Sequence, residues 1–219
     1  MTSGSSKFRI YTKTGDKGTA SLYNGQRLPK DDDMFHALGD VDELNSAVGV
    51  AREYCTEEAK LQQQLEEIQS RLLDVGSAVA TPADSSSQSK LARVAFPSSA
   101  TAEVEGWLDG LDDQLPALRN FILPSGGKAA AHLHMARSVC RRAERSVVPL
   151  VRAELVDLEV GKYLNRLSDY LFTAARYVAM KQGHPEVVYK KAAAAAAAAD
   201  NSKAAAMATE TADAAGAKQ

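Results

Sequence analysis

The sequence predicts an all-α fold in which five helices form one up-and-down bundle. Between residues 39 and 181, apolar side chains recur every three or four positions in five successive stretches, which is the spacing of one helix face. Proline, glycine or short polar runs separate the stretches, so successive helices are expected to run antiparallel. The chain has 219 residues, of which 45% are hydrophobic, and this is enough for one sizeable core in a single domain.

The first two helices are predicted from capping and periodicity. The first is expected to open at Asp40–Glu43, where DVDE resembles a capping sequence. Its apolar face then carries Val41, Leu44, Val48 and Ala51. The second ends before Pro82, and its apolar residues step by four and three as in a bundle helix: Leu61, Leu65, Ile68, Leu72, Val75 and Val79.

Three further helices follow a polar loop at residues 81–90, TPADSSSQSK. The third is short, ends before Pro116, and is marked by Val104, Trp107, Leu108, Leu111 and Leu115. The fourth is expected from about residue 128 to 148, with Ser125 as its N-cap. The fifth runs from about 157 to 181 and is stopped by Gly183 and Pro185.

The two ends of the chain differ in composition from the helical part. Residues 1–6 are expected to be disordered, and residues 7–36 form a strand-poor loop rich in Lys, Gly, Thr and Asp. The helical domain, including this loop, is expected to extend over residues 7–190. Residues 191–219 are rich in alanine without large side chains to bury, so frayed helix or disorder is expected there.

Composition excludes several classes of protein. A formal charge of −2 provides no global field for nucleic acid, and no apolar run is long enough to span a membrane. Cys55 and Cys140 form no CxxC or Cys/His cluster, which favours a reducing compartment and excludes structural zinc. His132 and His134 are two positions apart and do not share a helix face, so no metal site is expected. MTSGSSKFRI shows neither a signal core nor an arginine-rich presequence.

An unusual density of fixed charge lies in the fourth predicted helix, in ARSVCRRAER. Arg137, Arg141 and Arg145 are spaced by four, Glu144 projects from nearly the same side, and Arg142 flanks them. One interpretation is a solvated face with ion pairs along the helix. The other is an anion site, because the planar fork of arginine suits bidentate binding of phosphate.

A second candidate for anion binding is YTKTGDKGTASLYNG, residues 11–25. Two glycines flank Asp16 and Lys17, and threonines and lysines surround them, so the backbone N–H groups of this loop can turn toward an anion. The loop is not a Walker A sequence, because GxxxxGK[ST] is absent. An ordinary surface turn is the alternative interpretation.

Two further positions have a structural and a functional interpretation. Phe121, just before a Pro-Ser-Gly-Gly turn, is either a core anchor or a ligand-facing ring. Asn165 lies in an otherwise apolar helix, where a polar residue more often specifies bundle pairing than contacts a ligand.

Seven motifs in order resemble the PduO-type ATP:cob(I)alamin adenosyltransferases: IYTKTGDKGTASLYNG, RLPKDD, VDELNSAVG, DVGSAVATP, FILPSGGK, ARSVCRRAER and LNRLSDYLFTAARY. The resemblance covers roughly residues 8–190. It implies a homotrimer of five-helix bundles with active sites between adjacent subunits. It also implies transfer of the 5′-deoxyadenosyl group of ATP to the cobalt of cob(I)alamin, which forms adenosylcobalamin and releases triphosphate.

The resemblance also implies roles for individual residues. Those of the N-terminal segment that would contact the ATP polyphosphate are Thr12, Lys13, Thr14, Gly15, Ser21 and Lys30. Those that would complete the nucleotide site are Arg141, Arg142, Glu144, Arg145 and Asn165. Asp42 would pair with Arg137 across the subunit boundary, and Phe121 would lie against the corrin and exclude the lower axial ligand. Ala20 stands where relatives often have a polar side chain, and only its backbone N–H is left to contribute.

The implied chemistry agrees with the absence of a catalytic triad motif, because cob(I)alamin is itself the nucleophile. Mg²⁺ would enter bound to ATP, and a cobalamin reductase and a B12-dependent mutase are the implied partners. The implied compartment is the mitochondrial matrix in a eukaryote and otherwise the cytoplasm. Two alternatives are a non-catalytic helical oligomer and another ATP-using enzyme, such as a kinase or phosphohydrolase.

Overall fold

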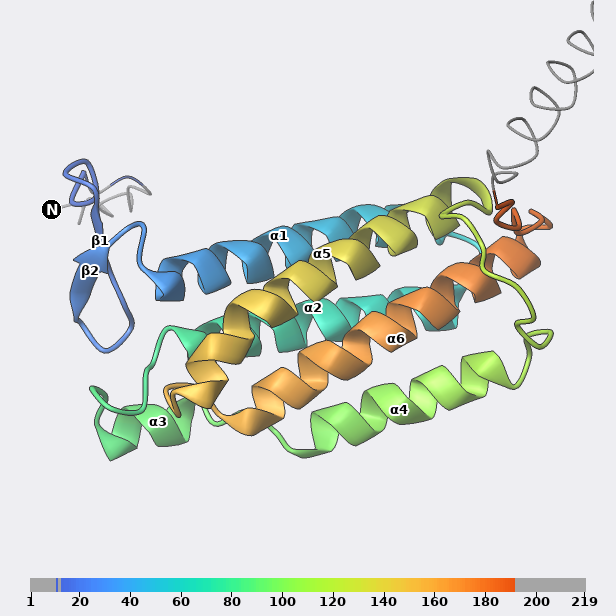
Figure 1. Cartoon of the computed structure of the whole chain (residues 1–219). Helices are drawn as coiled ribbons and strands as arrows, with labels where there is room; N and C mark the ends of the chain where they lie inside the picture. The colour runs from blue at the N-terminus through green and yellow to red at the C-terminus, as the bar shows by residue number, and fades with distance from the viewer. Residues whose placement is uncertain (1–10, 12, 192–219) are drawn as a thin grey trace, which may run out of the picture. The chain divides into compact units, whose positions relative to one another are not determined.

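The computed structural model describes residues 11 and 13–191, and within them the chain forms two short strands and six helices (Figure 1). Residues up to Val187 belong to one compact unit, which contains all of these elements; residues 188–191 are the described part of a second unit. The elements are β1 (Thr19–Ser21), β2 (Arg27–Pro29), α1 (Asp33–Glu53), α2 (Ala59–Val79), α3 (Gln88–Arg93), α4 (Ser99–Asp112), α5 (Gly127–Arg152) and α6 (Leu158–Lys181).

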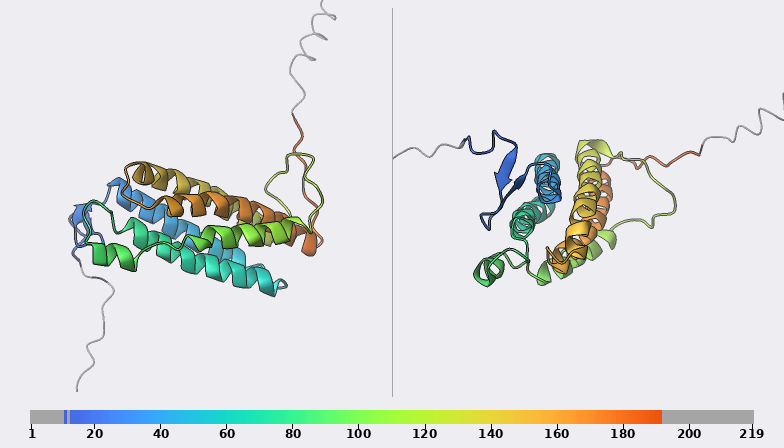
Figure 2. Two further views of the ribbon diagram at one scale, coloured as in Figure 1. Left: turned by 90° about the horizontal axis from the view of Figure 1, so that it is seen from below. Right: turned by 60° about the vertical axis from the view of Figure 1, so that its left-hand side comes forward.

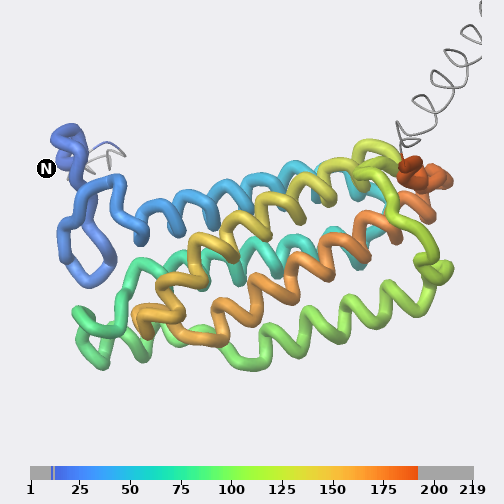
Figure 3. Tube along the Cα trace, in the orientation of Figure 1, coloured from blue at the N-terminus to red at the C-terminus, as the bar shows by residue number. Residues whose placement is uncertain are grey.

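The five longer helices pack side by side along one direction and alternate in chain sense, as the tube in Figure 3 shows. α5 packs against both α1 and α6, while α2 covers α1 and α4 covers α6. The two further views in Figure 2 show the same arrangement from other sides. The predicted all-α class is confirmed. The predicted count of five helices is not confirmed, because a sixth, short helix, α3, begins inside the predicted polar loop and extends beyond it to Arg93.

The first helix begins earlier than predicted. α1 starts at Asp33, and the Asp32 carboxylate caps it by accepting a hydrogen bond from the Met34 N–H at 2.9 Å. Met34 and Ala37 are buried, so the apolar face already includes this first turn. DVDE therefore lies inside the helix, and its first aspartate, Asp40, pairs with Arg142 instead of capping.

The N-terminal segment contains a hairpin where only a strand-poor loop was predicted. β1 and β2 pair antiparallel, with Ala20 opposite Leu28, and Gly25 closes the turn with a positive φ of 95°. Buried Leu22 and partly buried Leu28 pack on the core, and the Tyr23 N–H donates to the Ala80 carbonyl at the end of α2. The hairpin is therefore attached to the bundle by its own apolar side chains.

The N-terminus of α5 depends on glycine, and the prediction that Ser125 caps it is wrong. Gly126 occupies the cap with φ 96°, and a Cβ there would lie 2.6 Å from the Ala179 Cβ, so no larger residue fits. The Ser125 hydroxyl instead donates to the Leu123 carbonyl and accepts the Val187 N–H. α5 also extends through Pro149 to Arg152, beyond the predicted end.

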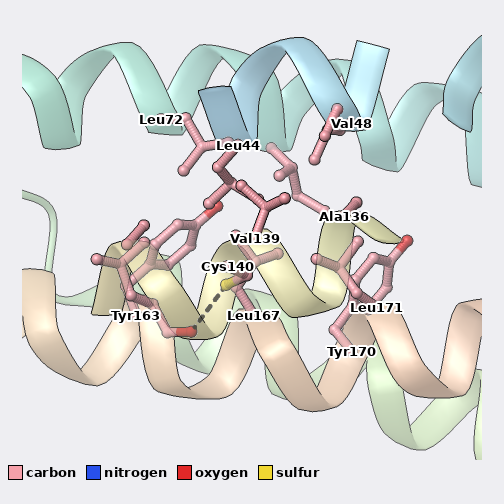
Figure 4. Close-up of a cluster of buried hydrophobic side chains, with 14 of the residues drawn as sticks. Leu44, Val48, Leu72, Ala136, Val139, Cys140, Tyr163, Leu167, Tyr170 and Leu171 are labelled. Atoms are coloured by element: carbon pink, nitrogen blue, oxygen red, sulfur yellow. Dashed lines mark hydrogen bonds between the residues drawn. The ribbon is translucent and has the colours of Figure 1, made fainter. Parts of the chain in front are cut away.

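The core lies between the helices and includes several polar tips on buried side chains (Figure 4). Tyr163 and Tyr170 are fully buried, and Tyr170 donates to Gln64 at 2.9 Å. Burial raises the pKa of the Cys55 thiol to about 11 and raises the pKa of Cys140 as well, so both stay protonated and neither supplies a thiolate nucleophile. No helix of the described chain is long and apolar enough to cross a membrane.

A matched pair of leucines in α6 tests this core. Leu164 is completely buried, whereas Leu158 is 58% exposed. Leu164→Ala is expected to lower the free energy of unfolding by about 2–5 kcal/mol, because it removes buried apolar surface and leaves a cavity. Leu158→Ala should change it by less than about 0.5 kcal/mol. Urea denaturation of both variants measures the difference, and equal losses would contradict the packing described.

Candidate functional site

The N-terminal loop brings a lysine ammonium over a glycine backbone. A Cβ at Gly15 would lie 3.2 Å from the Lys30 Nζ, so this ammonium crosses the loop where Gly15 leaves room. Lys13 adopts a left-handed φ of 58°, and Gly18 one of 77°. Thr12 lies outside the described residues. Lys13 and Gly15 thus lie on one short loop, and Lys30 reaches this loop from the end of β2, an arrangement suited to binding a polyphosphate.

Ser21 and Thr14, two further predicted ATP contacts, are held by one guanidinium. Arg27 Nη1 donates to the Ser21 hydroxyl at 3.0 Å, and Arg27 Nη2 donates to the Thr14 carbonyl at 2.8 Å. Arg27 opens the motif RLPKDD, but no role was predicted for it, because the hairpin that presents it was not predicted.

Ala20 is at a position where its N–H serves the hairpin. The Lys30 N–H donates to the Gly18 carbonyl, and the Leu22 N–H donates to the Gln26 carbonyl. In an antiparallel ladder hydrogen-bonded pairs alternate, so the intervening Ala20–Leu28 pair is also a hydrogen-bonded one. This register engages the Ala20 N–H in the hairpin ladder, and a contribution of that N–H to anion binding stays a prediction.

Arg137 and Arg141 line one cavity of about 530 Å³ between α4, α5 and α6. The guanidinium of Arg137 lies over the ring of Phe172, 5.8 Å from its centroid. The other residues lining the cavity are Leu108, Asp112, Arg166, Ser168, Asp169 and Thr173. The two predicted arginines thus do not simply form a solvated face, because both border a hollow large enough for part of a ligand.

Arg166 is a third arginine of this cavity that sequence reasoning missed. Its Nε donates to Glu105 at 2.8 Å and its Nη1 to Asp169 at 3.0 Å, which ties α6 to α4. The hydrogen bond with Glu105 is the main cause that raises the pKa of Arg166. The sequence pattern could have indicated Arg166, because Arg166, Asp169 and Phe172 follow one another at three-residue intervals along one side of a helix.

His134 contacts Phe172 of this cavity and does not contribute charge to it. The side chain is 4% exposed, and its ring centroid lies 5.9 Å from that of Phe172. Burial, and secondarily the positive charge of Arg137, lowers the pKa of His134 to about 4. At neutral pH the imidazole is uncharged, so the positive charge of the cavity comes from its arginines.

Glu144 and Asn165, two predicted contacts of the nucleotide, are hydrogen-bonded to each other. The Asn165 amide donates to the Glu144 carboxylate at 2.9 Å, across α5 and α6. Arg145 Nη1 donates to the Arg141 carbonyl at 3.0 Å, and both arginine side chains are exposed. The amide of Asn165 therefore joins α6 to a charged side chain of α5, which leaves both the bundle-pairing and the ligand-contact interpretation open.

Arg142 is directed differently from Arg141. Its Nε lies 3.1 Å from the Asp40 carboxylate, and its Nη2 contacts Glu43, so the guanidinium faces α1. The hydrogen bond with Glu43 is the main cause that raises the pKa of Arg142. Within one chain, the carboxylates of α1 therefore already engage this arginine, which was predicted to contact the nucleotide.

Asp42 and Arg137 border different cavities. Asp42 is exposed on α1 and lines a hollow of about 760 Å³ that also includes Asn45, Arg71 and Asp74. Within the described residues, the ion pairs of the single chain do not join Asp42 to Arg137. A pair between them would have to form between two copies of the chain.

Phe121 lies in the segment between α4 and α5 and is 85% exposed, which makes it an unusual position for a phenylalanine. The interpretation of Phe121 as a core anchor is therefore wrong for the single chain. The described residues also contain no group of three or more His, Cys, Asp or Glu side chains that could hold a metal ion.

A family model and similar curated proteins all indicate the same protein family. The model of the cobalamin adenosyltransferase family matches residues 10–178. The chain is 54% identical over 184 residues to the corrinoid adenosyltransferase MMAB of Mus musculus, covering 84% of this chain and 78% of that protein. It is 41% identical over 171 residues to a corrinoid adenosyltransferase of Mycobacterium leprae, covering 77% of this chain and 90% of that protein.

Solved structures resemble the chain as well. A variant PduO-type ATP:corrinoid adenosyltransferase from Lactobacillus reuteri, complexed with cobalamin and ATP, superposes with a TM-score of 0.76 at 40% identity. The match covers 84% of this chain and all of that one. A second variant from the same organism, complexed with ATP, gives a TM-score of 0.74 at 41% identity, covering 83% and 100% of the two chains.

Proposed function

Because the chain belongs to the cobalamin adenosyltransferase family, we propose that it transfers the 5′-deoxyadenosyl group of ATP to cob(I)alamin and forms adenosylcobalamin. The electron pair of Co(I) forms the new bond to C5′, and the bond from C5′ to the phosphate-bearing oxygen breaks. Triphosphate leaves with the electron pair of the broken C5′–O bond. The observation that carries the proposal is the cavity in which Arg137 and Arg141 meet.

In this reaction the side chains and backbone of the protein bind ATP and orient its C5′ atom toward the cobalt. Lys13, Lys30 and the Gly15 backbone bind polyphosphate, and Arg141 stabilises the charge that develops on the leaving group. Glu144 and Asn165 hold the nucleoside end of ATP, which aligns C5′ with the cobalt. A general base is not required, because the reduced cobalt is already a nucleophile.

Mg²⁺ would enter this site only when bound to ATP. The described residues provide no cluster of acidic or histidine ligands for a resident ion. Mg²⁺ commonly keeps waters and substrate phosphates as ligands, so it would arrive on the polyphosphate and neutralise part of its charge there.

Product identity separates this function from its alternatives. The protein is incubated with ATP, Mg²⁺ and chemically reduced cobalamin, and the optical spectrum is followed for formation of the cobalt–carbon bond. Adenosylcobalamin and triphosphate are the expected products. Release of ADP or phosphate without a spectral change would identify a kinase or phosphohydrolase, and absence of ATP binding in calorimetry would identify a non-catalytic helical oligomer.

We further propose that the working assembly is a homotrimer in which each subunit contributes its five longer helices as a bundle. The placement of Asp42 and Arg137 on separate cavities of one chain supports this proposal, because their pairing needs an adjacent subunit. The catalytic domain is proposed to extend over residues 7–190, consistent with the compact unit that reaches Val187, and residues 191–219 are proposed to have no catalytic role.

A double-mutant cycle tests the intersubunit pair. Asp42→Ala is expected to weaken the trimer by more than the roughly 0–1 kcal/mol of an exposed bridge, since it leaves the partly buried Arg137 unpaired. Arg137→Ala and the double variant complete the cycle, with trimer dissociation and activity as readouts. The exposed Arg52–Glu66 pair, which lies within one chain, is the matched control and should show little coupling. Additive effects at Asp42 and Arg137 would contradict the pair.

The chemistry also implies partners before and after this step. Cob(I)alamin must be supplied by a cobalamin reductase, and the adenosylcobalamin product suits a B12-dependent mutase. We propose the mitochondrial matrix as the compartment in a eukaryotic source and the cytoplasm in a bacterial one.

A further inference from the structure

Arg27 makes an unusual number of contacts for an exposed arginine. Its Nη2 donates to the Thr14 carbonyl at 2.8 Å, to the Thr19 hydroxyl at 2.7 Å and to the Thr19 carbonyl at 3.3 Å. Its Nη1 donates to the Ser21 hydroxyl at 3.0 Å. One guanidinium thus binds four oxygens of three residues: Thr14 in the N-terminal loop, and Thr19 and Ser21 in β1.

The hairpin that carries Arg27 is anchored to α3 and to the segment that precedes it. Asn24 at the hairpin turn donates from its amide to the Ser85 hydroxyl at 3.1 Å. The Lys90 ammonium of α3 binds the carbonyls of Tyr23 and Asn24, at 3.3 Å and 3.0 Å. Arg27 is therefore presented from a fixed position, whereas Thr14 belongs to the loop that precedes the hairpin.

We propose that Arg27 is a positioning residue for ATP, which holds the polyphosphate-binding loop in its binding conformation before the nucleotide arrives. The inference rests on the proposed function, since it assigns Arg27 a role in the same site. The donors of the guanidinium are directed at oxygens of the loop and of β1, so Arg27 acts through Thr14, Thr19 and Ser21.

The physical reason is that carbonyl oxygens and phosphate oxygens repel each other. The C=O and N–H of one trans peptide point in opposite directions, so a Thr14 carbonyl turned to Arg27 turns the Gly15 N–H the other way. The guanidinium thereby binds the acceptors of the loop on one side and leaves backbone donors for the anion on the other. The rigid fork of arginine can bridge several acceptors at once, which a lysine cannot reproduce.

The test compares Arg27→Ala and Arg27→Lys with Lys60→Ala, which removes one exposed positive charge from the start of α2. Arg27→Ala is expected to raise the KM for ATP about tenfold, equivalent to about 1.4 kcal/mol, and to leave the KM for cobalamin unchanged. Arg27→Lys should also show a raised KM for ATP, because lysine keeps the positive charge but lacks the planar guanidinium that bridges several acceptors. Lys60→Ala should behave as the unchanged protein.

A second measurement separates holding the loop from contacting phosphate. Without ATP, amide hydrogen exchange over residues 13–21 should be faster in Arg27→Ala than in the unchanged protein. An unchanged KM for ATP would overturn the proposal, as would a raised KM with unchanged exchange, which would make Arg27 a direct phosphate contact. If the unchanged protein forms no cobalt–carbon bond, the proposed function fails, and exchange together with ATP calorimetry still decides the role of Arg27.

Discussion

Replacing Arg141 with alanine is expected to lower turnover on the order of a hundredfold while the protein stays folded. Arg141 is exposed on α5, and its side chain borders the cavity that also contains Arg137. A hydrogen-bond donor that is fixed in place before the reaction stabilises developing charge without reorganising. Its loss therefore raises mainly the free energy of the transition state. The readout is the rate of adenosylcobalamin formation at saturating ATP, with a melting curve to check folding.

Two variants make this test specific. Arg141→Lys keeps the charge and loses the planar fork, so it should remain well below the unchanged protein. Arg152→Ala removes an exposed arginine from the last turn of the same helix and should retain near-normal turnover. Near-normal turnover of Arg141→Ala at saturating ATP would remove Arg141 from the mechanism.

The helical part of the fold was predictable because its periodicity is strong. In α2 the apolar residues step without interruption from Leu61 to Val79, and the structure places the helix at Ala59–Val79. The start of α1 was not predictable in the same way. Gly39, a poor helix former, interrupts the pattern, and the true cap at Asp32 lies within a run of three aspartates, each of which is an acceptable cap.

The candidate site was predictable where its residues share one helix face and not where they depend on tertiary contacts. Arg137 and Arg141 are four residues apart and do border one cavity. Arg142 is about a quarter turn away from Arg141 on the helix, but its partners on α1 become neighbours only when α1 and α5 pack. Arg27 shows no periodic signal at all, because its role depends on a hairpin of two three-residue strands.

Phe121→Ala is the substitution that best separates binding of cobalamin from stability. The side chain is 85% exposed, so its removal should leave the melting temperature nearly unchanged. We propose, as the family resemblance implies, that this exposed ring lies beneath the corrin and keeps the lower ligand from cobalt. We therefore expect adenosylation to fall by on the order of a hundredfold, as when the reacting atoms are misplaced by about 1 Å.

The matched control is Phe96→Ala, at a phenylalanine that is only 6% exposed and packs against Tyr163. That variant should lose about 3–5 kcal/mol of the free energy of unfolding, with activity following the folded fraction. For Phe121→Ala, the optical spectrum of bound cob(II)alamin should show a smaller four-coordinate fraction while ATP binding is retained. A large loss of stability together with an unchanged four-coordinate signal would show that the ring of Phe121 supports the fold and does not act on the cobalt.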